Sequence, residues 1–273
     1  MLDLMRGLRS GGAWALVLAG FCQPAMAAKS GPPACPARPI VVGLYEFGHF
    51  FHAGAGLDKD MAEELRKRSG CTFSLKVMQR RAIWPAMQSG TVDMTFSAAA
   101  TPERLLFSWA EPYVWVKHMV LLRKDVPANV RSTADFIAAP ELRLGFGRGY
   151  AAGTDHEEFV TQLRNIGRVE DVDDGDRLYA MFKAGRFQAV LASKMVYERY
   201  IKDEIASSAV RIEDWSASRP RVPANFMLSK KNFGAGEARR WAELLKAMRN
   251  DGTIQRLVAR YVGDDEAAKM LAP

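Results

Sequence analysis

An arginine placed just after a strand and a turn is the side chain of this sequence best suited to hold an anion. We expect a short helix at Ala82–Gln88, a strand at Met94–Phe96 and a turn made by Thr101 and Pro102, and Arg104 follows that turn. In an open α/β sheet, ligands bind in the crevice at the carboxyl ends of the strands. A guanidinium in that crevice offers two parallel N–H donors to a carboxylate. For such an arginine considered alone, a surface salt bridge is the more ordinary role.

Signatures of metal, nucleophile and nucleotide chemistry are weak in this chain. The sequence contains no H-E-x-x-H, C-x-x-C, G-x-S-x-G or P-loop pattern. His49 and His52 lie three residues apart without a nearby cysteine, so we expect surface or pocket side chains and no metal site. Gly147–Ala152 fits the pattern G-x-G-x-x-A, but a lone match of this kind is weak, and such glycines let backbone N–H groups approach any anion. We therefore expect no cofactor.

Short strands alternate with amphipathic helices along most of the chain. The first run has expected strands at Ile40–Leu44, Phe73–Val77, Met94–Phe96 and Val116–Leu122, and expected helices at Asp58–Ser69 and Ala82–Gln88. The second run follows a short helix capped by Ser132 or Thr133, and has expected strands at Arg143–Phe146, Val169–Val172, Ala189–Leu191 and Asn225–Leu228. Its expected helices are Asp155–Asn165, Arg177–Ala184, one from Ser193 to about Ile201, Glu237–Arg249 and Thr253–Val262. This alternation predicts an α/β architecture with largely parallel sheets, and the two runs predict two lobes.

Composition and charge exclude several classes of protein. The chain has 273 residues, of which 48% are hydrophobic and 25% are charged, so collagen-like and wholly disordered chains are excluded. The net charge of +7 is modest and is spread along the sequence without a block of Lys and Arg. We therefore expect no nucleic-acid partner.

The first residues have the three parts of a secretory signal peptide. Arg6 and Arg9 form a basic start, Ala13–Phe21 is an apolar run, and Ala25–Ala27 supplies small residues for cleavage. The apolar run is far shorter than the ~20 residues that a membrane span needs. A lipid anchor on Cys22 is the alternative, but the bulky Phe21 stands where a lipobox has a small residue. We predict that residues 1–27 are removed and that the mature protein is periplasmic.

Two cysteines remain after removal of the signal peptide, which also contains Cys22. Cys35 and Cys71 are an even pair in an oxidising compartment, and each lies shortly before an expected strand. If those strands are parallel neighbours, both sulfurs lie at the same edge of the sheet. We predict a Cys35–Cys71 disulfide, with two separate buried thiols as the alternative.

A set of short motifs, in order along nearly all of the mature chain, resembles that of a known family. The first motifs are Gly56–Ala62, Ser89–Asp93, Thr101–Arg104 and Glu111–Tyr113. The later ones are Leu144–Phe146 with Gly149, Leu178, Ala184–Arg186 with Ala189, and Asn250–Thr253. Each motif is soft, whereas the ordered set is fairly specific. The sequence resembles the periplasmic solute-binding proteins of polar amino-acid uptake systems, the extracellular solute-binding protein family 3.

The resemblance implies a two-lobed periplasmic-binding-protein fold (type II), of the α/β class. In it, two mainly parallel sheets with flanking helices are joined by two crossing strands, here near Tyr113–His118 and Arg219–Ala224. Residues 28–118 with 223–273 would form the first lobe, and residues 119–222 the second. Closure of such lobes on a ligand is an established class of motion.

The family's pattern also implies site residues. By analogy, Arg104 takes the carboxylate of the ligand, and Tyr45 or Phe47 walls the pocket after the first strand. Tyr150 lies where the family often has a small hydroxyl side chain that contacts the ligand. Backbone groups that exchange hydrogen bonds with the ligand are expected at Ser97, Ala98 and Ala99.

One departure from the family concerns the ammonium group of an amino acid. Amino-acid binders usually place a carboxylate after the strand that here begins near Ala189, and this chain has Ser193 at that position. A free ammonium would be poorly satisfied there, because unpaired buried charge is costly. Asp173 or Asp174 in a neighbouring loop is the alternative source of a carboxylate.

A second departure concerns positive charge. Arg80 and Arg81 stand where the family often has an aromatic ring that stacks on the ligand, and Arg148 lies in the glycine-containing loop of the second lobe. Together with Arg104, these side chains favour an anionic ligand.

The leading hypothesis is an exported binding protein, not an enzyme. It would capture a small carboxylate-bearing solute, an amino acid or an organic anion, and deliver it to the permease of an ABC transporter in the membrane. One alternative is an exported enzyme of the lyase or dehydratase type on the same scaffold, with Glu46 or Glu111 near the cleft. The other is a soluble ligand-sensing module. The resemblance also implies a monomer.

Overall fold

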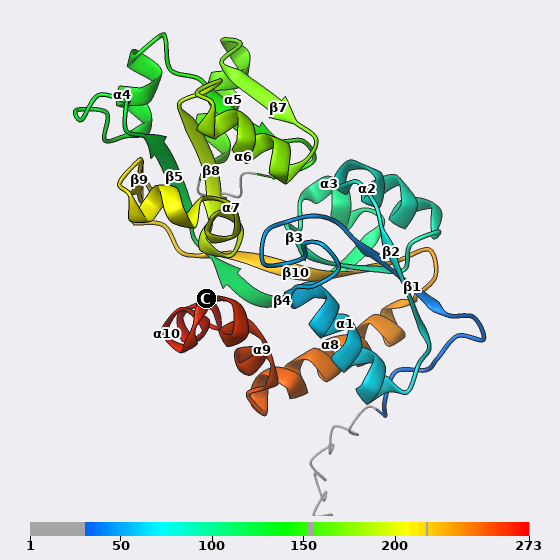
Figure 1. The fold of residues 1–273 in the computed structure, drawn as a ribbon. Coiled ribbons are helices and arrows are strands. Elements are labelled where there is room, and N and C mark those ends of the chain that lie inside the picture. The colour runs from blue at the N-terminus through cyan, green and yellow to red at the C-terminus, as the bar shows by residue number, and fades with distance from the viewer. Residues whose placement is uncertain (1–30, 152–155, 217, 273) are drawn as a thin grey trace, which may run out of the picture. The chain divides into compact units, whose positions relative to one another are not determined.

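Two five-stranded sheets with flanking helices make up the protein (Figure 1). The computed structural model describes residues 31–151, 156–216 and 218–272. The predicted signal peptide, residues 1–27, lies outside the described residues. Within those residues, no helix has the length and apolar character that a membrane crossing requires.

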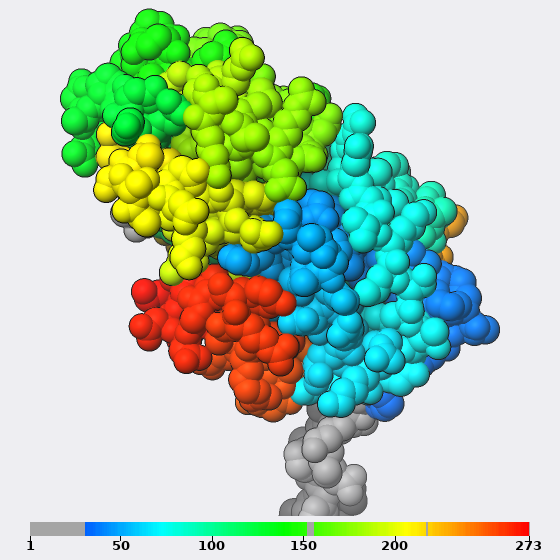
Figure 2. All heavy atoms as spheres, in the orientation of Figure 1, coloured from blue at the N-terminus to red at the C-terminus, as the bar shows by residue number. Residues whose placement is uncertain are grey.

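The first sheet combines strands from both ends of the chain. Its order is β2 (Phe73–Val77), β1 (Ile40–Leu44), β3 (Met94–Ala98), β10 (Val222–Ser229) and β4 (Ser108–Val116). Only β10 runs against the other four strands. The helices of this half are α1 (Leu57–Ser69), α2 (Arg80–Ser89), α3 (Pro102–Leu105), α8 (Ala235–Asn250), α9 (Thr253–Val262) and α10 (Asp264–Met270). We call this half the first lobe. In it the C-terminal helices, red in Figure 2, pack beside the N-terminal elements, and α9 contacts α1.

The second sheet uses only the middle of the chain. Its order is β7 (Val169–Val172), β6 (Leu144–Gly147), β8 (Ala189–Ser193), β5 (His118–Arg123) and β9 (Val210–Glu213), and only β5 runs against the others. Its helices are α4 (Thr133–Ala138), α5 (Glu157–Asn165), α6 (Gly175–Lys183) and α7 (Lys194–Ala206). We call this half the second lobe. The predicted two-lobed α/β fold is confirmed, and both of its sheets are mixed with one antiparallel strand each.

The chain crosses between the sheets twice. It leaves the first sheet after Val116 and joins the second at His118, and it returns from Glu213 to Val222. The two crossings lie side by side, because Val116 pairs with Val222 at the ends of β4 and β10. The limits of the two lobes given by the sequence, at residues 118 and 223, stay a prediction.

The predicted single strand Val116–Leu122 is wrong. The structure has two strands, β4 and β5, which belong to different sheets and are separated by Lys117. A continuous apolar run does not reveal where a chain changes sheets, because both strands are buried. The first part of β4 was also missed, since Pro112 and Glu111 resemble a turn. Proline is tolerated there because β4 is an edge strand whose outer N–H groups need no partner.

Other differences lie at surface elements. The sequence reading missed β9, α3 and α10, which are short, and it ended α7 near Ile201. That helix continues to Ala206 past a non-helical Ile201 with φ −134°. Short elements have too few residues for a periodic pattern to emerge.

The predicted disulfide is confirmed. Cys35 and Cys71 are bonded, with their Cα atoms 5.1 Å apart. The physical reason is the one expected from the sequence: β1 and β2 are parallel neighbours, with Ile40 opposite Phe73, so the segments that lead into them meet at one edge of the sheet.

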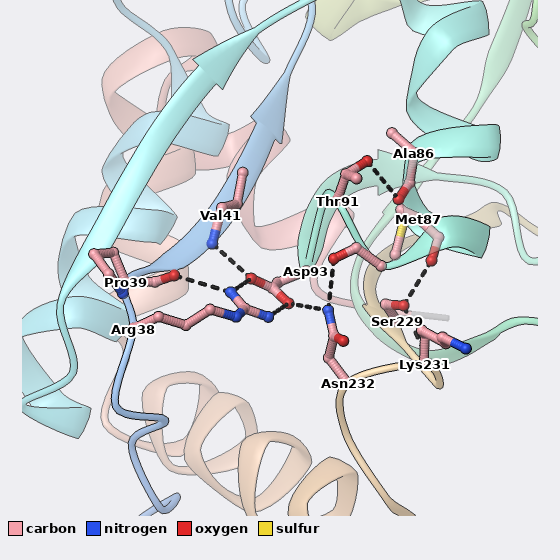
Figure 3. A network of polar contacts seen from close by, with 11 residues as sticks. Arg38, Pro39, Val41, Ala86, Met87, Thr91, Asp93, Ser229, Lys231 and Asn232 are labelled. Atoms are coloured by element: carbon pink, nitrogen blue, oxygen red, sulfur yellow. Dashed lines mark hydrogen bonds and ion pairs between the residues drawn. The ribbon is translucent and has the colours of Figure 1, made fainter.

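A buried carboxylate ties the same end of the sheet together (Figure 3). Asp93, just before β3, has a fully buried side chain and accepts two hydrogen bonds from Arg38, at 2.6 and 2.8 Å. It also accepts bonds from the Val41 backbone N–H at 2.8 Å and the Asn232 amide at 2.7 Å. Burial alone would raise the pKa of Asp93, but these hydrogen bonds outweigh burial and lower it.

Candidate functional site

A cavity of about 500 Å³ lies where the two lobes and the two crossings meet. This volume is in the usual range for small-molecule sites. The lining residues come from the loop after β1, the start of α2, the segment from β3 to α3, both crossings and the second lobe: Phe47, Phe50, Arg80, Ser97, Ala98, Ala99, Ala100, Thr101, Pro102, Glu103, Val116, His118, Tyr150, Ala151, Glu157, Ser193, Val222, Pro223 and Ala224.

Arg80 is the cation of this cavity. Its side chain is almost buried, with the residue 8% exposed. Its Nε donates to the Gly149 carbonyl at 3.2 Å and its Nη2 donates to the Ser97 carbonyl at 3.4 Å. Its Nη1 is buried and has no hydrogen-bond partner among the described residues. Arg80 therefore lines the cavity and keeps a buried, charged N–H group without a partner among the described residues. An anion that reached this group would complete its hydrogen bonding.

Aromatic rings hold the Arg80 guanidinium in place. It lies 4.4 Å from the ring centres of Tyr45 and Phe47 and 5.1 Å from that of Tyr150. Cation–π contacts of this kind stabilise a buried charge that has no carboxylate beside it. Arg80 also begins α2, where the helix dipole disfavours a cation and favours an anion. The position of Arg80 at the start of the helix therefore does not by itself stabilise the helix.

Tyr45 supports the site without lining the larger cavity. It is 1% exposed, and its hydroxyl donates to the carbonyls of Phe96 at 2.9 Å and Ser97 at 3.1 Å. Burial raises the pKa of Tyr45 to about 12, so it remains a neutral donor. Its ring contacts the guanidinium of Arg80, and its hydroxyl fixes the end of β3.

Ser97 has an unusual backbone conformation at that strand end. Its φ is +53°, in the left-handed region that side chains other than glycine seldom adopt. Its hydroxyl donates to the Asp58 carboxylate, which also accepts from the Tyr113 hydroxyl at 3.0 Å. Burial raises the pKa of Asp58 to about 7, against the opposing effect of these hydrogen bonds and of the Arg80 charge.

Arg104 is buried, but its guanidinium does not line the cavity. Its Nη1 donates to the Ala99 carbonyl and its Nη2 to the Gly149 carbonyl, each at 3.0 Å, and it lies 3.7 Å from the centre of a ring of Trp84. Burial lowers the pKa of Arg104 to about 10, helped by the positive charge of Arg80. Arg104 thus remains charged at neutral pH and spans the two lobes through Gly149. Its role as the partner of a ligand carboxylate stays a prediction.

The two other predicted arginines lie away from the larger cavity. Arg148 forms an ion pair with Asp173 at 2.9 Å and lines a second cavity of about 60 Å³. Arg81 is exposed, and its Nε lies 3.8 Å from the same carboxylate. Asp173 is therefore already engaged by cations, and neither it nor Asp174 lines the larger cavity.

The structure brings together most of the residues predicted for the site. Those that line the larger cavity are Phe47, Arg80, Ser97, Ala98, Ala99, Tyr150 and Ser193. Tyr45, Arg81, Arg104 and Arg148 do not. The Tyr150 hydroxyl is hydrogen-bonded to Nε2 of His118, which lies opposite Ser193 in the second sheet.

The sequence did not predict the apolar lining residues of the two crossings or the exposed acidic lining residues. Val116, Val222, Pro223 and Ala224 line the cavity because both crossings pass beneath it, and Phe50 lines it from the loop after β1. The expected crossings, near Tyr113–His118 and Arg219–Ala224, were the signal that could have identified the wall residues. Glu103 and Glu157 are exposed lining residues for which the sequence carried no such signal.

Two α/β lobes that share a cavity beside their crossings define a solute-binding protein of the two-lobed type. The chain belongs to the bacterial extracellular solute-binding proteins, family 3, whose family model matches residues 49–264.

A curated relative is similar in sequence, and solved structures share the fold. The L-cystine-binding protein TcyJ of Escherichia coli K12 is 24% identical over 219 residues, covering 77% of this chain and 75% of that protein. An ancestral arginine-binding protein bound to glutamine has a similar structure, with a TM-score of 0.67, 23% identity and coverage of 82% of this chain and 98% of the other. The ancestral amino-acid-binding protein AncCDT-1, a precursor of cyclohexadienyl dehydratase, has a TM-score of 0.65 and 21% identity, with coverage of 82% and 94%.

Proposed function

We propose that this chain captures a small carboxylate-bearing solute between its lobes and delivers it to a membrane transporter. One observation carries the proposal: Arg80 lines a cavity formed by both lobes, and its buried Nη1 has no hydrogen-bond partner among the described residues. The family of extracellular solute-binding proteins and a relative named for binding L-cystine support a binding role.

Capture follows from the position of Arg80. A carboxylate beside Nη1 would gain a charge-assisted hydrogen bond from a guanidinium that has no partner for this group among the described residues. The rest of the solute would contact Tyr150 and Ser193 of the second lobe, so binding would hold the lobes together. Exclusion of water by closure would strengthen the charge-assisted hydrogen bonds.

The place of action is also part of the proposal. The predicted secretory signal at residues 1–27 and membership of an extracellular family support a periplasmic protein that works with a transporter permease. We propose that it works as a monomer. Co-purification with a permease reconstituted in vesicles, and solute uptake that requires this protein, would test the delivery step.

Thermal unfolding in the presence of candidate solutes tests capture. The mature protein is unfolded and refolded to remove bound solute, and is then heated with amino acids, dicarboxylates, aromatic acids and uncharged analogues. A solute at a hundredfold its Kd stabilises the folded state by about 2.7 kcal/mol. We expect a shift for a carboxylate that is lost in Arg80→Gln and kept in Arg81→Gln, an exposed neighbour.

Arg104→Gln separates the two arginines. Because the Arg104 guanidinium donates to backbone carbonyls, we expect this variant to lower the affinity for charged and uncharged solutes alike. If Arg104→Gln alone removes the preference for carboxylates, Arg104 is the anion partner and the role proposed for Arg80 is wrong. If no carboxylate shifts the unfolding temperature, the proposed function is wrong.

We propose binding without a reaction. Glu46 is exposed and lines only the smaller cavity, and its carboxylate lies 3.1 Å from Nδ1 of His52 and accepts a hydrogen bond from the Ala53 N–H. Glu111 lines neither cavity. Mass spectrometry of the solute after incubation with the protein should recover it unchanged. A converted solute would instead support an enzyme of the lyase or dehydratase type.

A further inference from the structure

We propose that the solute is a carboxylate with an apolar body and no ammonium group, so that it is held by charge at one end only. This inference rests on the proposed function and names its solute class. It departs from the relatives, whose names refer to amino acids.

The charged end of the cavity accepts anions only. Arg80 offers its free Nη1, and Arg104 lies close enough for the two positive charges to affect one another. Asp58 is a buried acid whose pKa is affected by the Arg80 charge, yet its carboxylate is held by Ser97 and Tyr113 and does not line the cavity. An ammonium group placed here would be repelled by the charge of Arg80, with the charge of Arg104 behind it, and would meet no buried carboxylate among the described lining residues.

The middle of the cavity is built for an apolar body. Phe47 lies with its ring centre 5.4 Å from that of Phe50, nearly parallel to it, and 5.4 Å from that of Tyr150. Other lining groups are aliphatic, from both crossings and from the end of β3 and the residues after it: Ala98, Ala99, Ala100, Val116, Val222, Pro223 and Ala224. Burial of an aromatic or branched body against these surfaces supplies the non-polar part of the affinity.

The polar groups that remain are neutral or exposed. Ser193 is 3% exposed and offers a hydroxyl, while His118 is already bonded to Tyr150. The carboxylates among the described lining residues, Glu103 and Glu157, are both exposed. An ammonium group moved from water to the buried part of this cavity would lose hydration without gaining a charged partner, which is costly. A solute without that group avoids the cost.

Matched pairs of solutes test the inference. Isothermal titration at pH 7.4 compares 3-phenylpropanoate with L-phenylalanine, indole-3-propanoate with L-tryptophan, and 4-methylpentanoate with L-leucine. The members of each pair differ only by the ammonium group. We expect the acid without the ammonium group to bind at least tenfold more tightly in the pair whose body fits, and Arg80→Gln to remove at least tenfold of that affinity.

Three other results would overturn the inference, and one of them would also overturn the proposed function. Tighter binding of the amino acid in any pair overturns the inference and leaves the proposed function standing. Binding confined to small polar acids such as succinate or citrate overturns the inference that the solute has an apolar body. If none of these carboxylates binds, with or without an ammonium group, the proposed function is overturned as well.

Ser193→Asp supplies a gain-of-binding test. If the missing charge partner excludes ammonium groups, this variant should shift the preference toward the amino acid of the matched pair by at least tenfold. Ser193→Asn, of the same size without the charge, is the control and should not shift it. An equal shift in both variants would show that size and not charge determines the preference, and would overturn the inference.

Discussion

The hydroxyl of Ser97 donates a hydrogen bond to the buried carboxylate of Asp58, and so joins the end of β3 to the start of α1. The Tyr113 hydroxyl contacts both groups, at 3.0 Å from Asp58 and 2.9 Å from Ser97. Three oxygens thus make three mutual contacts, while the two hydroxyls supply two protons. This arrangement holds Ser97 in its left-handed conformation, from which its carbonyl accepts a bond from Arg80.

Asp58→Asn should change how stability depends on pH. Burial raises the pKa of Asp58 from an ordinary value of 3.8 to about 7. Between those values the folded state holds a proton that the unfolded state lacks, so this group's contribution to stability is complete below about pH 4 and is lost as the pH rises through 7. The loss is about 1.4 kcal/mol per pH unit. Urea unfolding of both proteins from pH 4.5 to 7.5 measures the difference, and parallel curves would contradict the prediction.

Asp93→Ala should destabilise the protein strongly. Its carboxylate is fully buried, and its removal leaves Arg38, the Val41 N–H and the Asn232 amide without their acceptor. Each buried hydrogen-bonding group left without its partner costs about 1–3 kcal/mol, whereas the half-exposed Arg38 can be hydrated. Asp171→Ala is the matched control, because Asp171 forms a similar two-point pair with Arg164 at the surface. We expect the control to cost less than about 1 kcal/mol in urea unfolding. Equal costs would show that burial of Asp93 is unimportant.

Reduction of the disulfide should lower the unfolding temperature. Cys35 and Cys71 are separated by 36 positions, and closing a loop of this length stabilises a fold by about 2–4 kcal/mol. Thermal unfolding with and without a reductant measures the effect. The double variant Cys35→Ala/Cys71→Ala should unfold at the lower temperature in both conditions. A reductant effect that persists in the double variant would point to another cause.

Gly145→Ala should disrupt the core of the second lobe. A methyl group on Gly145, in β6, would lie 2.1–2.5 Å from ring atoms of Phe187, which is fully buried. Overpacking of this kind costs about 1–3 kcal/mol. Gly147→Ala in the same strand is the control, since its methyl group would meet only the Tyr150 Cβ at 3.7 Å. Chemical unfolding should separate the two variants, and equal stability would mean that Phe187 moves aside freely.

Much of the fold was accessible from the sequence because its cause is local. The spans Ile40–Leu44, Phe73–Val77, Val169–Val172 and Thr253–Val262 were predicted with the limits that the structure has. Their apolar spacing and flanking glycines act over a few residues, so no distant contact is needed to read them. The disulfide followed from the same information, since two strands that pair in parallel bring their leading segments together.

Some features of the site follow from the sequence, and others depend on the tertiary structure. The sequence by itself determined that cations, small residues and aromatic rings gather after the strands of an α/β fold. Only the tertiary structure decided which arginine has a free donor. Arg104 is satisfied by Gly149, 45 positions along the chain, whereas Arg80 keeps Nη1 free between rings from both lobes. Whether a hydrogen-bonding group is free depends on which backbone and side-chain groups the fold brings to it, and those groups lie far apart in the sequence.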